Sequence, residues 1–155
     1  MIELEFEEFF NQDYEIEELH ELYILLNGEG TVLYVGISKR NIWERWFGFG
    51  GHMYFDGVHF YGTSQVGQKI EDNLPNSLNW KIQLLTLEDC INYCKDILPL
   101  QGMPTIDLVE PFMIQKLTPV LNIANNLNPG KDTTPKSSKE IERDKELDNA
   151  YRRVF

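Results

Sequence analysis

The sequence predicts an α/β domain of the α+β kind, in which a small, mostly antiparallel sheet of three strands is flanked by helices. Two runs rich in aliphatic, aromatic and β-branched residues, Leu22–Leu26 and Thr31–Val35, have the composition of strands. Between them, Asn27–Gly30 reads Asn-Gly-Glu-Gly, and these residues tolerate the positive φ angles of a hairpin turn. A third such run, Leu78–Leu85, follows helix-like sequence, and we expect it to complete the sheet.

The segment before the hairpin is compatible with two structures. Ile2, Leu4 and Phe6 alternate with glutamates, which is typical of a strand with one acidic face. Phe9 and Phe10 follow directly and also permit the start of a helix. Both interpretations stay open for this segment.

Helices are indicated by capping residues and by glycine stops. A helix over residues 41–47 starts at an asparagine cap and ends at a glycine-rich stretch, 48–51. We expect an irregular loop or a short strand over residues 52–60 and a short helix over 66–73. A threonine followed three residues later by an acid starts a helix over residues 86–97.

The last helix of the core is expected over residues 106–117. Pro119 follows it and cannot continue a helix. Leu108, Phe112 and Leu117 are expected among its buried residues.

The chain length and cysteine content favour one intracellular domain. At 155 residues the chain suits a single core. Cys90 and Cys94 lie four apart in a helical run, and no second Cys or His pair has metal-site spacing, so we expect both to be buried as small apolar residues. No apolar run approaches the roughly 20 residues needed to span a membrane, and the N-terminus lacks a basic signal region. A cytoplasmic protein is expected.

The net charge of −11 is unevenly distributed. Residues 1–21 hold nine acidic and no basic side chains, and we interpret them as an acidic N-terminal arm. Residues 22–128 form the expected domain, and from 129 onward a polar linker leads to a weakly amphipathic helix over 138–155. Residues 22–130 hold seven basic and ten acidic side chains, which leaves room for a local basic site on an acidic protein.

The order of residues along the hairpin is similar to that of the GIY-YIG nuclease family. A tyrosine, a hairpin, a second tyrosine, a hydrophobe, a glycine and a helical arginine follow one another, at Tyr23, Tyr34, Gly36 and Arg45. Glu21 stands where the first motif of the family has a glycine.

The resemblance extends to the end of the expected domain. The family ends its core with a helix that carries a metal-binding glutamate, followed by a proline and an asparagine. Glu110, Pro119 and Asn122 match this segment, so the resemblance covers about residues 19–125.

The resemblance implies roles for individual residues. Tyr23, Tyr34, Arg45, His52 and Glu110 would be catalytic, with the carboxylate of Glu110 binding one divalent cation. Magnesium or manganese is expected, because hard ions accept carboxylate and water ligands. Four further residues would contact the substrate: Gly36, Lys39, Arg40 and Asn122.

Each of these residues also has a structural explanation. Tyrosines in a hairpin pack in a core, a glycine at a strand end forms a bulge, and an asparagine after a helix caps it. A glutamate at a helix start is favoured by the helix dipole, and a histidine in a loop, such as His52 or His59, is often a surface residue. Trp43, Trp46, Phe47 and Phe49 could stack on bases, but at helical spacing most of them are expected in the core.

The resemblance therefore implies a metal-dependent endonuclease that hydrolyses DNA phosphodiester bonds. A phenol is a poor base at its ordinary pKa, so a water-activating tyrosine would need Arg45, Lys39 or the cation to lower that pKa. The alternative is a binding module of the same fold, catalytically weak or inactive, that acts through protein or nucleic-acid partners. DNA is the expected partner, and a membrane is not. Substrate choice is expected to come from a second copy of the chain, from another protein, or from the tail over residues 138–155.

Overall fold

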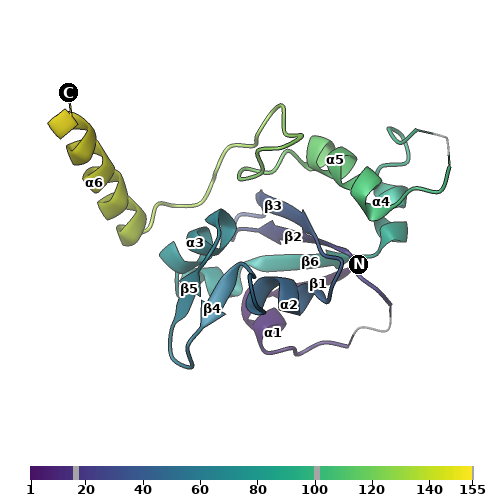
Figure 1. The fold of residues 1–155 in the computed structure, drawn as a ribbon, viewed down its shortest axis with the longest axis horizontal. Helices are drawn as coiled ribbons and strands as arrows, with labels where there is room; N and C mark the ends of the chain where they lie inside the picture. Colours follow the sequence, from purple (N-terminus) through teal and green to yellow (C-terminus); the bar gives the residue numbers. More distant parts are fainter. Residues whose placement is uncertain (16–17, 100–101, 155) are drawn as a thin grey trace.

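The computed structural model describes residues 1–15, 18–99 and 102–154, and within these it has a four-stranded antiparallel sheet, a two-stranded sheet and six α-helices (Figure 1). The main sheet has the order β1 (Ile2–Glu5), β6 (Lys81–Leu85), β2 (Leu22–Leu26) and β3 (Val32–Ile37). The small sheet pairs β4 (Met53–Phe55) with β5 (Phe60–Gly62). The helices are α1 (Phe6–Phe10), α2 (Ile42–Phe47), α3 (Gln65–Asp72), α4 (Leu87–Tyr93), α5 (Ile106–Leu117) and α6 (Ser138–Val154), with a 3-10 helix, η1 (Asn76–Asn79).

The mixed α/β fold was predicted, but the prediction of three strands in the sheet is wrong. The N-terminal segment adopts both of the structures that its sequence permits: β1 pairs with β6, with Ile2 opposite Leu84, and α1 follows at once. Phe6 and Phe9 of α1 are fully buried. The first ten residues therefore belong to the sheet and its core, although they were expected to lie in an acidic arm outside the domain.

The sheet separates two hydrophobic cores, because successive side chains of a strand point to opposite faces. Tyr23 and Leu25 of β2 face the layer that contains α1, α2 and α3. Leu22 and Ile24 face α4 and α5 on the other side. Both faces of β2 are thus covered, which explains why its sequence is an uninterrupted apolar run.

The second core confirms one prediction and corrects two. Cys90 and Cys94 are buried and free, and the Cys94 thiol lies 3.2 Å from the sulfur of Met113. Leu108 was expected in this core but is 59% exposed, because α5 buries the face that carries its neighbour Val109. Helix α4 ends at Tyr93, four residues before the expected end.

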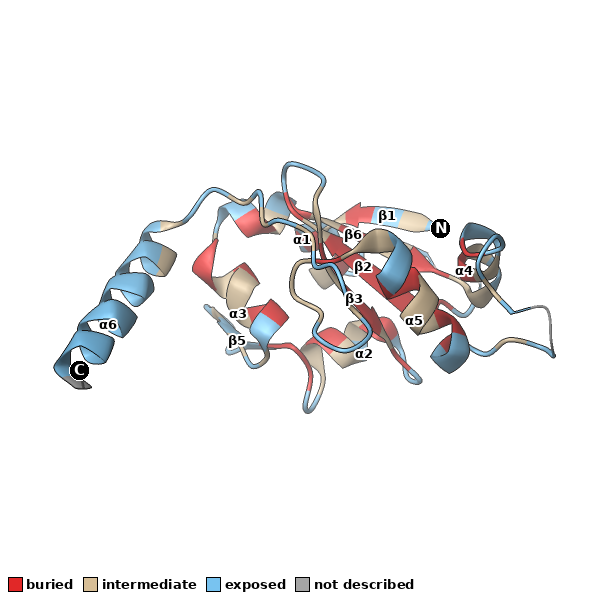
Figure 2. Cartoon of the chain, turned by 90° about the horizontal axis from the view of Figure 1, so that it is seen from above, coloured by how far each residue is buried: buried red, intermediate tan, exposed pale blue. Residues whose placement is uncertain are grey.

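The C-terminal helix projects from the domain and is mostly exposed (Figures 1 and 2). Its first turns are anchored to α3. Lys69 of α3 binds Glu140 at 2.7 Å and Asp132 of the linker at 2.8 Å, and Arg143 pairs with Asp72.

No helix in the described part of the chain is long and apolar enough to cross a membrane.

Candidate active site

A β-bulge in the hairpin places both motif tyrosines on one side of the sheet. Leu26 pairs with Val32 and Leu25 pairs with Tyr34, so Leu33 is an extra residue in β3. Beyond the bulge, Tyr34 lies on the same face as its partner Leu25. The rings of Tyr23 and Tyr34 are 6.2 Å apart. Without the extra residue the side chain of Tyr34 would point to the opposite face.

Tyr23 is a buried support for His52. Its side chain is 1% exposed, and its hydroxyl lies 2.7 Å from Nε2 of His52. Nδ1 of His52 lies 2.7 Å from the hydroxyl of Ser64, which caps α3. Because a neutral imidazole carries one N–H, it donates one of these hydrogen bonds and accepts the other. Both ring nitrogens are therefore fixed.

Gly36 provides the space for the Tyr23 ring. Gly36 lies directly opposite Tyr23 in the pairing of β2 with β3. A Cβ atom at position 36 would lie 2.3 Å from the Tyr23 hydroxyl oxygen. The missing side chain of the buried Gly36 thus lets Tyr23 approach closely, and its expected contact with a substrate phosphate stays a prediction.

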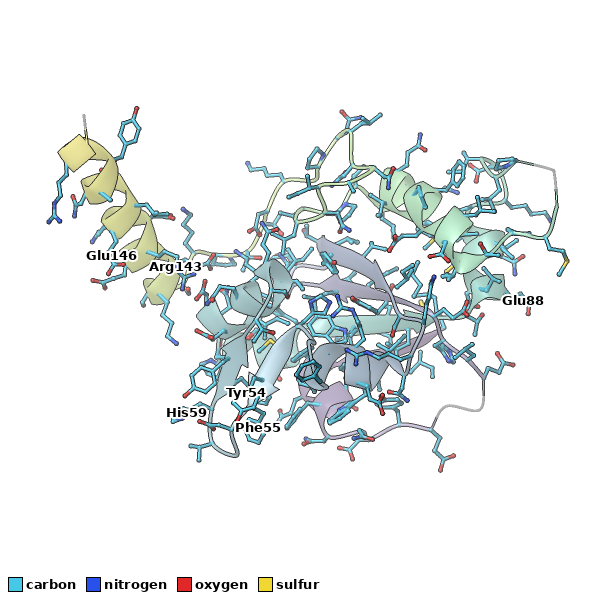
Figure 3. All side chains as sticks on the ribbon, viewed as in Figure 1. Tyr54, Phe55, His59, Glu88, Arg143 and Glu146 are labelled. Atoms are coloured by element: carbon cyan, nitrogen blue, oxygen red, sulfur yellow. The ribbon has the colours of Figure 1, made fainter. Side chains whose placement is uncertain are left out.

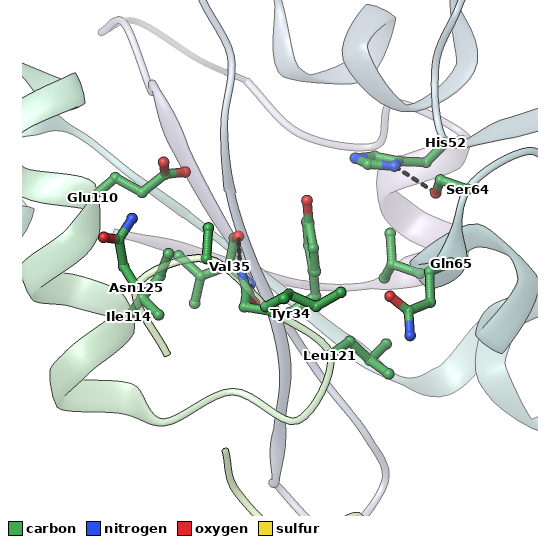
Figure 4. A pocket seen from close by; sticks show the side chains of 13 residues that line it. Tyr34, Val35, His52, Ser64, Gln65, Glu110, Ile114, Leu121 and Asn125 are labelled. Carbon is green, nitrogen blue, oxygen red and sulfur yellow. Dashed lines mark hydrogen bonds between the residues drawn. The ribbon is translucent and has the colours of Figure 1, made fainter. Parts of the chain in front are cut away.

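A cavity of about 330 Å³ opens at the edge strand β3. Tyr34 lies between the other polar groups, with Glu110 of α5 on one side and His52 and Ser64 on the other (Figure 4). The polar lining is completed by three amide side chains, those of Gln65, Asn122 and Asn125. Three segments that are distant in the sequence therefore place a phenol, an imidazole and a carboxylate around one space.

Arg45 acts on this site through its charge. It lies on α2, and its guanidinium lowers the pKa values of Tyr23, Tyr34 and His52, which places all three in its field. Nη1 of Arg45 lies 3.5 Å from the carbonyl oxygen of Gly50. A guanidinium in this position can neutralise a phosphate that enters the cavity.

Lys39 and Arg40, two of the expected substrate contacts, lie outside this cavity. Lys39 pairs with Asp107 of α5 at 3.3 Å, and both side chains are exposed. Arg40 donates a hydrogen bond to the carbonyl oxygen of Phe49 at 3.0 Å. Neither cation lines the cavity.

Asn122 extends the edge of the sheet. Its side-chain oxygen accepts a hydrogen bond from the Val35 amide at 2.9 Å, and its side-chain nitrogen donates to the Val35 carbonyl oxygen at 2.8 Å. The side-chain amide thus replaces the peptide group of a neighbouring strand. This is a structural role, and it holds the segment that lines the cavity after α5.

Burial dominates the acid–base properties of the site. Burial raises the pKa of Tyr23 and of Tyr34, and the field of Arg45 does not offset it. Burial, with help from Arg45, lowers the pKa of His52 to about 3. Burial and the nearby Asp107 raise the pKa of Glu110. The expectation that the surroundings lower the tyrosine pKa values is therefore wrong for this arrangement of protein groups.

One carboxylate is available to a cation in the cavity. Glu110 is the acidic side chain among the lining residues, and Asn125 offers an amide oxygen. In the described residues no group of three or more His, Cys, Asp and Glu side chains is placed to hold a metal ion. A single carboxylate suits a hard cation that retains most of its water ligands.

Sequence reasoning missed Ser64 and Asn125. A serine followed by a helix suggests a cap, and Ser64 is one, but nothing in the sequence shows that its hydroxyl also meets His52. Asn125 has a φ angle of 61°, in the left-handed region that asparagine tolerates. That backbone conformation is set by the turn, and no sequence motif indicates it.

Acid should destabilise the protein through His52. The pKa of His52 is about 3 when folded, against about 6.5 in an unfolded chain, so the unfolded state binds a proton first as the pH falls. The stability contributed by the neutral ring is present above pH 6.5 and is lost progressively toward pH 3, by up to about 4 kcal/mol. Urea unfolding between pH 7 and pH 4 measures it.

The same titration on His52→Gln should lack this component. The free energy of unfolding of the wild type, relative to that of the variant, should therefore decrease as the pH is lowered. The exposed His59 provides the control, and His59→Gln should follow the wild-type curve. Parallel curves for wild type and His52→Gln would contradict the assignment.

Comparisons of the chain with family models, with curated proteins and with solved structures gave no match. Its function is therefore inferred from the geometry of the site.

Proposed function

We propose that this domain is a metal-dependent endonuclease of the GIY-YIG kind, which hydrolyses phosphodiester bonds in DNA. The observation that supports it is the convergence of Tyr34, His52 and Glu110 on one cavity within the field of Arg45. A cavity that is lined by a carboxylate and lies within the field of a guanidinium suits a cation and a phosphate together.

Arg45 and Tyr34 would act on the reacting phosphate and on water. The guanidinium of Arg45 offers two parallel donors to phosphate oxygens and stabilises the additional charge of the transition state. Tyr34 reaches into the cavity and its hydroxyl would hold the attacking water. As the water oxygen bonds to phosphorus, the P–O ester bond breaks, and the proton of the water ends on the leaving hydroxyl.

His52 and Tyr23 would position this arrangement. His52 stays neutral at pH 7 because burial lowers its pKa, so the cavity gains no positive charge from it. The hydrogen bonds to Tyr23 and Ser64 fix the plane of the ring beside Tyr34, at a ring distance of 5.6 Å. Tyr23 is a positioning residue, because it does not reach the cavity.

Glu110 would hold the divalent cation, with Asn125 beside it. The cation would supply charge neutralisation at the phosphate and a lower pKa for bound water. The raised pKa of Glu110 fits this role, since a cation is a favourable partner for a carboxylate that burial and Asp107 destabilise.

One observation favours the alternative, a nucleic-acid-binding module without turnover. The pKa values of Tyr23 and Tyr34 are raised and that of His52 is lowered, so none of these three groups is poised to exchange protons near neutral pH. The two proposals differ in one measurement, the cleavage of DNA in the presence of magnesium.

The test is nicking of supercoiled plasmid by the purified full chain, with magnesium and with EDTA. We expect nicking with magnesium alone, and a loss of at least tenfold in Tyr34→Phe, because general acid–base and water-positioning groups contribute roughly 10²- to 10⁴-fold. The matched control is Tyr93→Phe, the same change at an exposed tyrosine of α4. Absence of magnesium-dependent nicking in the wild type would leave the binding module as the function.

A further inference from the structure

The loop that joins α2 to β4 presents one phenylalanine to solvent. Phe49 lies between glycines in Gly48–Gly51, and its side chain is 99% exposed. The other three aromatic residues of this segment, Trp43, Trp46 and Phe47, are buried or partly buried in the first core, as expected. Phe49 thus differs from these neighbours in its exposure, and an exposed ring of this size adds no buried apolar area to stabilise the fold.

The loop is held in place by its backbone. The Gly48 amide donates to the carbonyl oxygen of Glu44 at 2.7 Å, and the Gly51 amide donates to that of Gly48 at 3.0 Å. Thr63 of the following segment donates to the Gly51 carbonyl oxygen at 2.5 Å. Gly50 has a φ angle of 70°, which favours glycine. The loop therefore presents Phe49 from a defined backbone.

An apolar groove of about 570 Å³ adjoins Phe49. Phe47 and Met53 line it together with Phe49, and Tyr54 of β4 contributes a second exposed ring. Figure 3 shows Tyr54 on the β4–β5 hairpin, at the border of the molecule. The groove is thus bordered by aromatic surfaces that are open to an incoming planar group.

Two arginines with no acidic partner support this loop. The guanidinium of Arg40 bonds to the carbonyl oxygen of Phe49, and that of Arg45 to the carbonyl oxygen of Gly50. Within the described ranges neither arginine lies in an ion pair, whereas Lys39, beside Arg40, is paired. In a protein with a net charge of −11, two unpaired guanidinium groups that bond to the backbone of an apolar groove are complementary to a ligand that is aromatic and anionic.

The groove and the candidate active site are neighbours in the chain. Gly51 lines the groove, and His52, the next residue, lines the cavity that contains Tyr34 and Glu110. Arg45 lines neither of them, but it contacts Gly50 of the groove and its charge acts on Tyr34 and His52 of the cavity. The segment Gly51–His52 therefore contributes to both the groove and the cavity.

We propose that Phe49 and Tyr54 form a base-stacking platform, and that the substrate is DNA with an unpaired stretch beside the scissile bond. A base in an intact duplex is stacked on both faces and has no free face for Phe49, whereas an unpaired base can stack on an exposed ring. Arg40 and Arg45 hold the flanking phosphates. This inference rests on the proposed nuclease function for the position of the scissile bond, but the platform itself is tested by binding alone.

The test is fluorescence anisotropy with a labelled single-stranded 12-mer and with its duplex, both in EDTA, so that no cleavage occurs. We expect the wild type to bind the single strand more tightly than the duplex. Phe49→Ala should weaken single-strand binding roughly 5- to 100-fold, which is the range for one stacked base, and should affect duplex binding much less. Because Phe49 is exposed, circular dichroism should show an unchanged fold.

Two further variants separate stacking from charge. Phe49→Trp should restore single-strand binding, and the emission of the new exposed indole should be quenched by the oligonucleotide. Arg40→Gln should reduce the salt dependence of binding by about 0.7 in log–log slope, which is one phosphate contact on a single strand, whereas Phe49→Ala should leave the slope unchanged. Met103→Ala, at an exposed apolar side chain between α4 and α5 that does not line the groove, is the control and should bind as the wild type.

Wild-type single-strand affinity in Phe49→Ala would overturn the platform, as would equal losses on single strand and duplex. These outcomes are independent of turnover. Plasmid nicking without any effect of Phe49→Ala on binding would support the nuclease proposal and overturn the platform. Phe49-dependent binding without nicking would support the platform and overturn the nuclease proposal.

Discussion

Replacement of Glu110 by glutamine should abolish magnesium-dependent cleavage and leave the domain folded. Glutamine keeps the size of the side chain but removes the charge that would hold the cation, so we expect a loss of roughly 100-fold or more in the nicking rate. Burial and Asp107 raise the pKa of Glu110, which means that the surroundings disfavour its charged form. The melting temperature of the variant should therefore equal or slightly exceed that of the wild type.

The matched control is Glu88→Gln, which makes the same change at an exposed carboxylate of α4 (Figure 3). That variant should cleave as the wild type does. Wild-type cleavage by Glu110→Gln would remove the carboxylate from the mechanism. A fall in melting temperature of more than a few degrees would instead identify a structural carboxylate, since ~1 kcal/mol shifts a domain of this size by roughly 2 to 8 °C.

Removal of residues 1–10 should prevent folding. This deletion removes β1 from the edge of β6 and exposes the core surface that Phe6 and Phe9 cover. Phe6 packs edge-on against Trp46 at 5.3 Å, and Trp46 in turn lies 4.7 Å from the ring of His52. The N-terminal segment thus supports the floor of the candidate active site, and its loss should affect stability and the site together.

A point substitution measures the same contribution without truncation. Phe6→Ala should lower the free energy of unfolding by about 3–5 kcal/mol, the usual cost of removing a buried aromatic ring. The control on the same helix is Glu7→Ala, whose side chain is exposed, and it should unfold at nearly the wild-type urea concentration. A soluble, folded deletion variant with wild-type stability would restore the interpretation of this segment as a separate arm.

Local signals in the sequence located most helices and strands, and long-range contacts account for the remainder. The Asn41 cap and Pro119, which follows α5, act within one turn, so α2 and α5 have nearly the predicted ends. The choice between strand and helix for residues 2–10 depended on β6, which lies more than 70 residues away and pairs only with the first part of the segment.

Three of the residues named from the sequence, Tyr34, His52 and Glu110, line one cavity, and their catalytic roles stay a prediction. The sequence did not indicate the geometry, because the difference between the two tyrosines depends on the bulge at Leu33 and on burial. No pattern in the sequence distinguishes a tyrosine that faces a cavity from one that lies beneath a histidine. The resemblance named Asn122 by its position after α5. Its hydrogen bonds to Val35 depend on the segment after α5 lying along β3, which no local pattern in the sequence indicates.

The segment after α5, which runs along β3, also affects how copies of this protein can associate. The amides of Val120 and Leu121 donate to the carbonyl oxygens of Val32 and Leu33, and Asn122 occupies both polar groups of Val35. An open strand edge is a template on which other chains add strands and aggregate, and here that template is already filled. The opposite edge, β1, has only four residues, of which two are glutamates. Any association between copies of this protein should therefore use side-chain surfaces and not a continuous sheet.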